Sequence, residues 1–335
     1  MTQQEQKKRI FSGIQPTGEL HIGNYIGALT QWAEQQMQYD SVFCIVDLHA
    51  ITIPESIEPE YLRKKTREAA AILLASGIDP ECSAVFIQSH IPAHTELTWI
   101  LNCVTPIGWL ERMTQYKAKS EQLESVSTGL LDYPVLQAAD VLLYHTHLVP
   151  VGEDQRQHIE LMRDIAERFN RLFGAVFVLP EPVIRDSGAR VMGLDDPTAK
   201  MSKSLGEKRK GHAIGIVDPP DLIREKIMRA VTDSGKETRF DYATPGVVNL
   251  MVIYEVLSKH GRDAIEAHFE GKGYGALKRE LADLVIATLQ PVRERYLNLM
   301  GDPSHLEELL RQGAERVRPI AEATLNQVKA LVGLG

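Results

Sequence analysis

Short, continuously apolar runs alternate with longer segments of helical spacing in the first half of the chain. Ser41–Val46 and Ala84–Ile87 are such runs, rich in β-branched and aromatic residues, as is typical of strands buried on both faces of a parallel sheet. Pro59–Ala75 lies between them and has the pattern of a helix ending near Gly77. The order strand, helix, strand is therefore expected here.

The same order returns further along the chain. Two more strands are expected at Leu148–Val151 and Ala175–Leu179, with a helix over Gln155–Leu172 between them. Repeated strand–helix–strand units predict an α/β fold, a doubly wound parallel sheet with right-handed crossovers. Ligands of such sheets bind at the carboxyl ends of the strands, where the turn after the first strand and the loops at Asp47 and Gly152 would converge.

Strand patterns stop at about Leu205, and the second half is expected to be all helical. Asp218-Pro219-Pro220 starts a helix that reaches Val231. The remaining helices are expected at Val247–His260, at Tyr274–Met300 with a kink at Pro291, and from Asp302-Pro303 to about Leu331. The pattern divides the chain into an α/β domain, residues 1–204, and a helical domain, residues 205–335, whose last helix could pack back on the first domain.

Composition narrows the class of protein. The 335 residues are 44% hydrophobic and 24% charged, as in an ordinary soluble protein with room for two cores. No run is long enough to span a bilayer, and Met1–Arg9 lacks the apolar centre of a signal peptide, so we expect a cytoplasmic protein without membrane contact. Cys44, Cys82 and Cys103 are too scattered for a zinc site and are expected to be reduced core residues.

The net charge of −8 argues against a coat for nonspecific nucleic-acid binding. Two local basic patches still leave RNA open, Arg63-Lys64-Lys65 with Arg67, and Lys208-Arg209-Lys210. Either patch could equally be a solvated face, which is the commoner role of a charge run.

The most distinctive stretch is Ser12–Ala28, where glycines 13, 18 and 23 separate a short strand from a helix start. We call residues 13–23 the glycine turn. Glycines let backbone approach a ligand closely, and unpaired N–H groups at a helix start suit phosphate. His21 and Asn24 are three residues apart and could face one bound anion. The plainer interpretation is a tight turn with structural glycines in which the backbone satisfies His21.

Far downstream, Lys200-Met201-Ser202-Lys203-Ser204 combines two lysines and two serines around a methionine. This segment, called the lysine loop below, has the composition of a mobile loop that closes over phosphates. A solvated surface loop would explain either lysine alone, but not the two sites together.

With these motifs the sequence resembles the class I aminoacyl-tRNA synthetases. His21-Ile22-Gly23-Asn24 is similar to their first signature and the lysine loop is identical to their second. Four further motifs resemble the bacterial-type tryptophanyl-tRNA synthetases: Gly13-Ile14-Gln15-Pro16-Thr17-Gly18, Asp47-Leu48-His49-Ala50-Ile51-Thr52, Tyr133-Pro134-Val135-Leu136-Gln137-Ala138-Ala139-Asp140 and Gly152-Glu153-Asp154-Gln155. Several ordered motifs are more specific than one, and the resemblance covers nearly the whole chain.

The resemblance implies a Rossmann-like nucleotide-binding domain and a tRNA-binding helical domain. It implies that ATP, with Mg²⁺ but no dedicated metal site, activates L-tryptophan to tryptophanyl-adenylate, which then esterifies tRNA(Trp). It also implies a homodimer and an anticodon read by the helical domain. The expected ATP-binding residues are Gln15, Pro16, Thr17, Gly23, Asn24, Gly152, Glu153, Asp154, Val191, Lys200, Met201, Ser202, Lys203 and Ser204. The expected catalytic residues among them are Gln15, Asn24, Lys200, Ser202 and Lys203.

A charged residue in an apolar helix marks the expected tryptophan pocket. Between Lys119 and Arg156 there is no Lys or Arg, yet Asp140 lies among apolar residues, where a carboxylate is costly unless it is paired. An indole N–H needs an acceptor, and the resemblance gives Asp140 that role, together with the other expected tryptophan-binding residues His49, Tyr133, Gln155 and Phe11. Otherwise Asp140 pairs with a distant Arg or a backbone group, His49 is a loop histidine, and Asp154 caps a helix. Gln137 replaces an expected methionine, which leaves the pocket lining open.

Three other functions remain open from the sequence. Tyrosyl-tRNA synthetase is the nearest enzyme in architecture. A small-molecule nucleotidyltransferase would share the glycine turn but would not need the helical domain. A nonenzymatic RNA-binding or regulatory protein could retain the scaffold, although the intact lysine loop argues against it.

Overall fold

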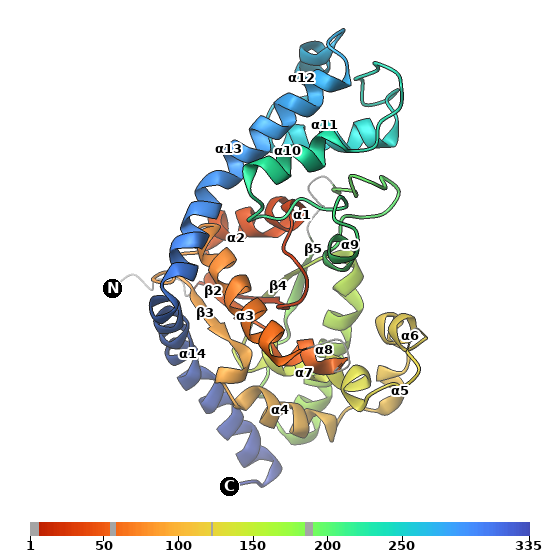
Figure 1. Cartoon of the computed structure of the whole chain (residues 1–335). Helices are drawn as coiled ribbons and strands as arrows, with labels where there is room; N and C mark the ends of the chain where they lie inside the picture. The colour runs from red at the N-terminus through yellow and green to blue at the C-terminus, as the bar shows by residue number, and fades with distance from the viewer. Residues whose placement is uncertain (1–6, 54–57, 122, 185–189) are drawn as a thin grey trace, which may run out of the picture.

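The computed structural model describes residues 7–53, 58–121, 123–184 and 190–335, without the side chains of residues 204, 207 and 208. One sheet of five parallel strands lies at its centre, in the order β3-β2-β1-β4-β5 (Figure 1). The strands are β1 (Arg9–Ile14), β2 (Asp40–Ile45), β3 (Ala84–Ile87), β4 (Leu148–Val151) and β5 (Glu181–Ile184). The chain changes direction across the sheet between β1 and β4, so the loops after these strands open at a topological switch point. The predicted α/β class and parallel sheet are confirmed.

Helices cover both faces of this sheet. They are α1 (Ile22–Asn24), α2 (Thr30–Gln35), α3 (Pro59–Ala75), α4 (Ala93–Asn102), α5 (Ile107–Leu110), α6 (Thr114–Ser120), α7 (Thr128–Leu142), α8 (Arg156–Phe173), α9 (Lys203–Lys208), α10 (Pro220–Met228), α11 (Pro245–Ser258), α12 (Arg262–Phe269), α13 (Tyr274–Gly301) and α14 (Pro303–Val332). A π-helical turn, Tyr25–Leu29, joins α1 to α2. The bounds predicted for β3, β4 and α3 agree with the structure residue for residue.

Alternation along β2 separates two cores. Phe43 and Ile45 point into a cluster with α3 and the helices α10 to α13, whereas Val42 and Cys44 point into a cluster with α4, α7 and α8. Successive side chains of a strand face opposite sides of the sheet, so one buried strand serves both cores. The continuous apolar run that predicted this strand is thereby explained.

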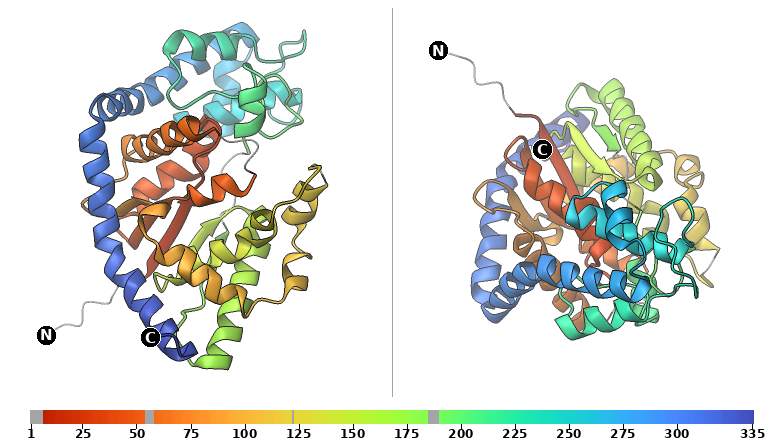
Figure 2. Two further views of the ribbon diagram at one scale, coloured as in Figure 1. Left: turned by 60° about the horizontal axis from the view of Figure 1, so that its bottom comes forward. Right: turned by 90° about the horizontal axis from the view of Figure 1, so that it is seen from above.

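The last two helices run one after the other along one side of the molecule (Figure 2). Helix α14 packs so closely on β3 that a side chain at Gly313 would strike the backbone of Val85. Arg316 donates hydrogen bonds to the carbonyls of Pro80 and Glu81. The last helix therefore packs on the sheet of the first predicted domain. The domain boundary at residue 204 remains a prediction.

Two expectations about local structure are wrong. Residues 175–179 form no strand, because the side chain of Asn170 bonds the N–H groups of Val176 and Phe177 and the carbonyl of Phe177. These groups are thus unavailable to a β-ladder, and the strand forms later, as β5. Of the cysteines only Cys44 belongs to the core; Cys82 lies partly exposed in a turn and Cys103 is exposed.

Within the described ranges, no helix combines the length and the apolar character needed to cross a membrane.

Candidate active site

The glycine turn leaves β1 and is held from outside by a later segment. The N–H of Ile22 donates to the carbonyl of Ile214 at 2.8 Å, and the N–H of Ile216 donates to the carbonyl of Leu20 at 2.9 Å. The sequence predicts free N–H groups at this helix start, and for Ile22 that is wrong, because residues 214–216 run antiparallel beside the turn. Their bonds fix the turn in place.

His21 and Asn24 do different things in this turn. The Asn24 side chain accepts a hydrogen bond from the His21 N–H at 3.1 Å. The His21 ring is 5% exposed, and its Nδ1 has no hydrogen-bond partner among the described residues. Burial, together with Lys203, Lys200 and His212, lowers the pKa of His21 to about 3. The ring is therefore neutral at physiological pH, next to the lysine loop.

His21→Gln is expected to flatten the dependence of stability on pH between about pH 4 and 6. The folded protein keeps His21 neutral down to pH about 3, whereas the unfolded chain protonates it near its ordinary pKa of 6.5. The unfolded state thus binds the extra proton, and the free energy of unfolding falls as pH drops, by about 1.4 kcal/mol per unit. Urea unfolding of the native protein and the variant across this pH range measures the difference.

The exposed Gln327 on α14 supplies the control, since Gln327→Ala removes no titratable group and should leave the slope unchanged. Equal slopes in the native protein and His21→Gln would show that His21 takes up a proton in the folded state.

The lysine loop grows out of a small hairpin. Met192 pairs with Lys200 in an antiparallel bridge, and the N–H of Met201 donates to the carbonyl of Val191 at 3.1 Å. Met201 is only 1% exposed, so it anchors the loop in the core. Ser202 then caps α9 by accepting from the N–H of Leu205.

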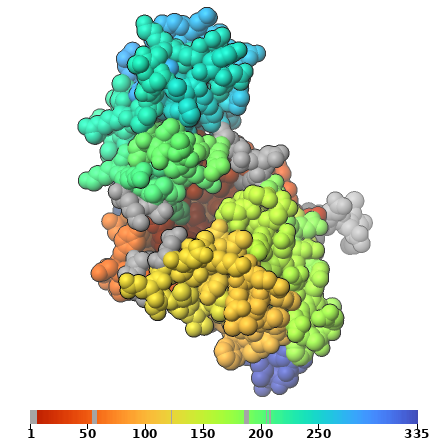
Figure 3. All heavy atoms as spheres, turned by 90° about the vertical axis from the view of Figure 1, so that its right-hand side faces the viewer, coloured from red at the N-terminus to blue at the C-terminus, as the bar shows by residue number. Residues whose placement is uncertain are grey.

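Lys203, the first residue of α9, brings the lysine loop onto the glycine turn. Its Nζ donates to the carbonyl of Gln15 at 2.9 Å. Gly18 adopts a φ of +67°, and a Cβ there would lie 2.5 Å from that of Lys203, so only glycine allows this approach. Two motifs separated by nearly two hundred positions thus touch each other. The surface is hollowed between the green and yellow segments in Figure 3, with red amino-terminal atoms at the floor of the hollow.

The other expected phosphate-site residues lie on the same segments or next to them. Lys200 is exposed, and its carbonyl lies 3.3 Å from Nε2 of His212. Val191 is buried beside Gly23. Thr17 and Pro16 continue the turn after Gln15, and the side chain of Ser204 lies outside the described atoms.

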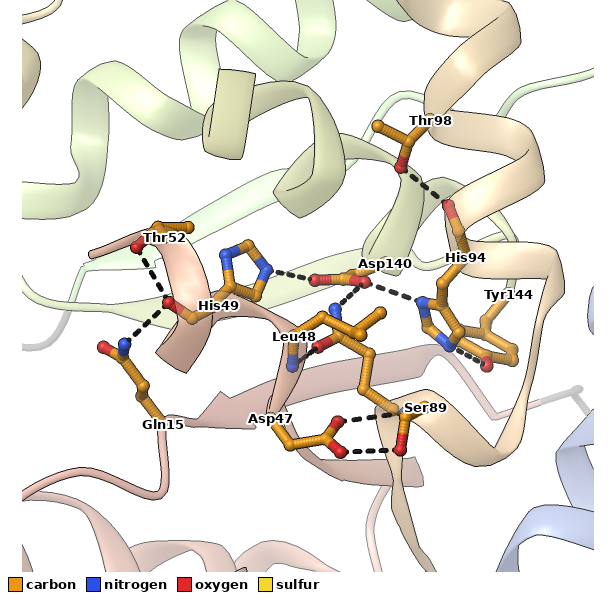
Figure 4. A network of polar contacts seen from close by, with 11 residues as sticks. Gln15, Asp47, Leu48, His49, Thr52, Ser89, His94, Thr98, Asp140 and Tyr144 are labelled. Atoms are coloured by element: carbon orange, nitrogen blue, oxygen red, sulfur yellow. Dashed lines mark hydrogen bonds and ion pairs between the residues drawn. The ribbon is translucent and has the colours of Figure 1, made fainter. Parts of the chain in front are cut away.

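A buried polar network surrounds Asp140, which is 1% exposed on α7 (Figure 4). Its Oδ1 accepts from Nε2 of Gln88 and from Nδ1 of His94, both at 2.6 Å. Its Oδ2 accepts from Nε2 of His49 at 2.8 Å. The other ring nitrogen of His94 lies 2.7 Å from the hydroxyl of Tyr144. The acid is thus fixed by side chains from the loop after β2, the end of β3, and α4.

The sequence shows no cation near Asp140, but the fold gives its carboxylate three partners within the chain. Burial raises the pKa of Asp140, but the hydrogen bonds and charges of His49 and His94 outweigh it and hold the pKa well below its usual range. The alternative in which Asp140 pairs within the chain is therefore what the structure shows, with two histidines and a glutamine instead of an arginine. Because a carboxylate has about four acceptor positions, Oδ2 retains capacity for one more donor.

The remaining expected pocket residues lie at different depths. The Tyr133 hydroxyl bonds Nε2 of His158 at 2.8 Å, its ring meets His49 edge-on at 6.4 Å, and burial raises the pKa of Tyr133 to about 12. Phe11 is instead in the core, stacked on Tyr144 at 5.8 Å. It supports the network from behind Tyr144.

The Gly152 loop is exposed and acidic. Glu153 forms two hydrogen bonds with Arg156, at 2.7 and 3.0 Å. The Asp154 carboxylate accepts from the Gln155 side chain at 2.9 Å, and α8 begins after Gln155 without a side-chain cap. Capping by Asp154, which the sequence leaves open, is therefore not its role here.

Sequence reasoning missed Gln88 and His94. Both lie more than forty positions from Asp140 in the chain. The available signal was their place just after a predicted strand, at the edge where ligands of such sheets bind.

Comparison with known proteins adds independent findings. Residues 3–290 match the family model described as tRNA synthetases class I (W and Y). The chain is 54% identical over 98% of its length to a tryptophan–tRNA ligase of Gloeobacter violaceus, of which 96% is covered. It is 52% identical to that of Wolinella succinogenes, with 98% and 99% coverage. A crystal structure of tryptophanyl-tRNA synthetase from Campylobacter jejuni, complexed with ADP and tryptophan, is similar with a TM-score of 0.86 at 37% identity, covering 97% of this chain and 100% of that one.

Proposed function

The chain belongs to the class I tRNA synthetases for tryptophan and tyrosine, and within them to the tryptophan–tRNA ligases; from this premise we propose how its residues perform the reaction. The tryptophan carboxylate attacks the α-phosphorus of ATP, pyrophosphate leaves, and tryptophanyl-adenylate remains. A ribose hydroxyl at the end of tRNA(Trp) then takes the tryptophanyl group and releases AMP. Neither step requires a protein nucleophile.

The contact of Lys203 with the glycine turn carries this proposal. Its ammonium group already lies against the backbone of Gln15, and phosphate oxygens entering there would replace that carbonyl as acceptors. Lys200 would approach from the same loop, while Pro16, Thr17, Gly23 and Asn24 line the opposite side. Catalysis would then consist of positioning the triphosphate and stabilising charge as it moves onto pyrophosphate.

Other parts of the loop system complete the proposed nucleotide site. Val191 and Met201 would shape its wall, and Ser202 and Ser204 would add hydroxyl donors. Gly152, Glu153 and Asp154 provide carbonyl and carboxylate acceptors for ribose hydroxyls. Mg²⁺ would enter with ATP, held by phosphate oxygens and water, since this ion retains several waters in nucleotide sites.

For tryptophan recognition we propose that Oδ2 of Asp140 accepts the indole N–H. The oxygen is already oriented by His49, and Tyr133 and Gln155 would lie along the ring and the backbone of the substrate, with Phe11 behind. A phenol would place its hydroxyl elsewhere and leave the buried acceptor unsatisfied, which disfavours tyrosine.

The test is amino-acid-dependent ATP–pyrophosphate exchange. We expect exchange with tryptophan and little with tyrosine at equal concentration. A preference for tyrosine would contradict the assignment of Asp140, and absence of exchange with either amino acid would support the nonenzymatic alternative.

Binding of tRNA(Trp), a homodimer and a cytoplasmic location complete the proposal. In the structure all four cations of the first basic patch pair with carboxylates, Arg63 with Glu60, Lys64 and Lys65 with Glu68, and Arg67 with Glu307. Arg209 of the patch after the lysine loop also lies near carboxylates, 3.9 Å from Asp195 and 3.9 Å from Asp196, so we propose that both patches attract tRNA. Titration of tRNA at increasing salt tests this attraction, because a flat response would exclude phosphate contacts. Sedimentation at several concentrations tests the dimer.

A further inference from the structure

A polar side chain is buried among apolar side chains in the helical part of the chain. Asn249 lies on α11 within the run Val247–Ile253 and is 4% exposed, while Val247, Leu250 and Met251 beside it are fully buried. Burying an amide is costly unless its groups are hydrogen-bonded. Its partners therefore indicate why an amide is there.

Both polar groups of Asn249 bond the same residue. Its Oδ1 accepts from the N–H of Met192 at 2.8 Å, and its Nδ2 donates to the carbonyl of Met192 at 2.9 Å. A side-chain amide can thus stand in for a neighbouring strand, since it offers one donor and one acceptor side by side. Among the natural side chains of this size, asparagine alone provides that pair.

Met192 is the residue that faces the lysine loop. On its other side it pairs with Lys200, and the flanking bonds are Gly193 N–H to Ala199 carbonyl at 2.9 Å and Met201 N–H to Val191 carbonyl at 3.1 Å. Met192 is thus bonded to α11 on one side and paired with Lys200, in the second strand of the hairpin, on the other. Two residues past Met201, Lys203 contacts the glycine turn.

From this arrangement we propose that Asn249 is a positioning residue for the adenylation step. It holds the hairpin at Met192, and the hairpin sets where Lys203, two residues beyond Met201, stands relative to the triphosphate. The inference rests on the proposed function, because it assigns Asn249 to the same release of pyrophosphate. Through this contact, α11 of the helical part would help to position the lysine loop.

Asn249→Leu removes both bonds while it keeps the branching and the number of side-chain heavy atoms, and Asn249→Asp retains only the acceptor. We expect kcat of tryptophan-dependent exchange to fall about 10-fold in Asn249→Leu, with the two Met192 groups left unsatisfied, and by less in Asn249→Asp. The dissociation constant of tryptophan, measured by equilibrium dialysis, should stay unchanged. Its proposed partner Asp140 lies on α7, whereas Asn249 bonds the hairpin.

Asn170 supplies a matched control. It also binds backbone through both ends of its amide, to Val176 and Phe177, but it lies on α8, whose buried apolar side chains belong to the other core and not to the core of Met201. Asn170→Leu should lower stability in urea without lowering kcat of the folded enzyme.

A double-mutant cycle with Lys203→Ala separates positioning from general destabilisation. If Asn249 acts through Lys203, its substitution should cost less than about two-fold once Lys203 is absent. A cost in the Lys203→Ala background equal to that in the native one, or an unchanged kcat in both Asn249 variants, would overturn the inference. If the native chain shows no exchange at all, the proposed function fails first and this inference with it. Should Asn249→Leu not fold, Asn249→Asp decides by the same measurements.

Discussion

Replacing Lys203 by alanine is expected to slow formation of tryptophanyl-adenylate by about 10²- to 10³-fold, the usual cost of removing one group that stabilises transition-state charge. The ammonium group of Lys203 is held against Gln15, where the triphosphate would enter. Its contribution should grow as negative charge moves onto the leaving pyrophosphate. Tryptophan should keep its dissociation constant, because its proposed partner is Asp140 and not Lys203.

Single-turnover adenylation with labelled ATP measures the rate, and equilibrium dialysis measures tryptophan binding. Lys210→Ala is the matched control, because Lys210 is an exposed lysine shortly after the same loop and should leave adenylation unchanged. Weaker tryptophan binding with an intact adenylation rate in Lys203→Ala would show that Lys203 belongs to the amino-acid site instead.

Asp140→Asn is expected to raise the dissociation constant of tryptophan about 100-fold, the effect of losing a hydrogen bond to a buried charge. An asparagine fills the same volume, but when its oxygen accepts from His94 and Gln88, its amide nitrogen takes the place of Oδ2, where it donates and cannot accept the indole N–H. The free energy of unfolding should also fall by about 3 kcal/mol, because a buried polar cluster loses its charged centre.

The comparison for this variant is Asp132→Asn on the same helix. Asp132 is half-buried and accepts a hydrogen bond from Asn102 at 2.8 Å, and burial raises the pKa of its carboxyl. Its substitution should hardly change tryptophan affinity. A tryptophan analogue with sulfur in place of the indole N–H should bind the native protein and Asp140→Asn equally, whereas full tryptophan affinity in Asp140→Asn would assign the acid to structure alone.

The sheet could be predicted from sequence where a strand is central and apolar. Cys44 and its neighbours are buried on both faces, so their pattern was unambiguous. The edge strand β5 was missed because Pro182 argues against a strand, although an edge tolerates proline. The apolar residues before it predicted a strand in the wrong place, because Asn170 occupies their backbone groups.

Only those parts of the site that lie within sequence motifs could be predicted. The glycine turn and the lysine loop were expected to share a ligand, and the structure places Lys203 on Gly18. The acidic centre was also expected, but its partners His94 and Gln88 were not, since pairing across more than forty positions depends on the sheet order. Asn249, like Asp140, was visible as a polar residue in an apolar helix, a signal that marks burial without naming the partner.

The close packing of α14 on β3 bears on the timing of folding during synthesis. The core that contains Phe11 and Cys44 also contains Val317, Leu325 and Val328, which leave the ribosome after the parts of this core that belong to the sheet. Until those residues emerge, one face of the earliest strands has an apolar surface without its final cover. Nascent chains halted before α14 should therefore bind chaperones and be cut readily by proteases, and should become resistant once α14 has left the ribosome.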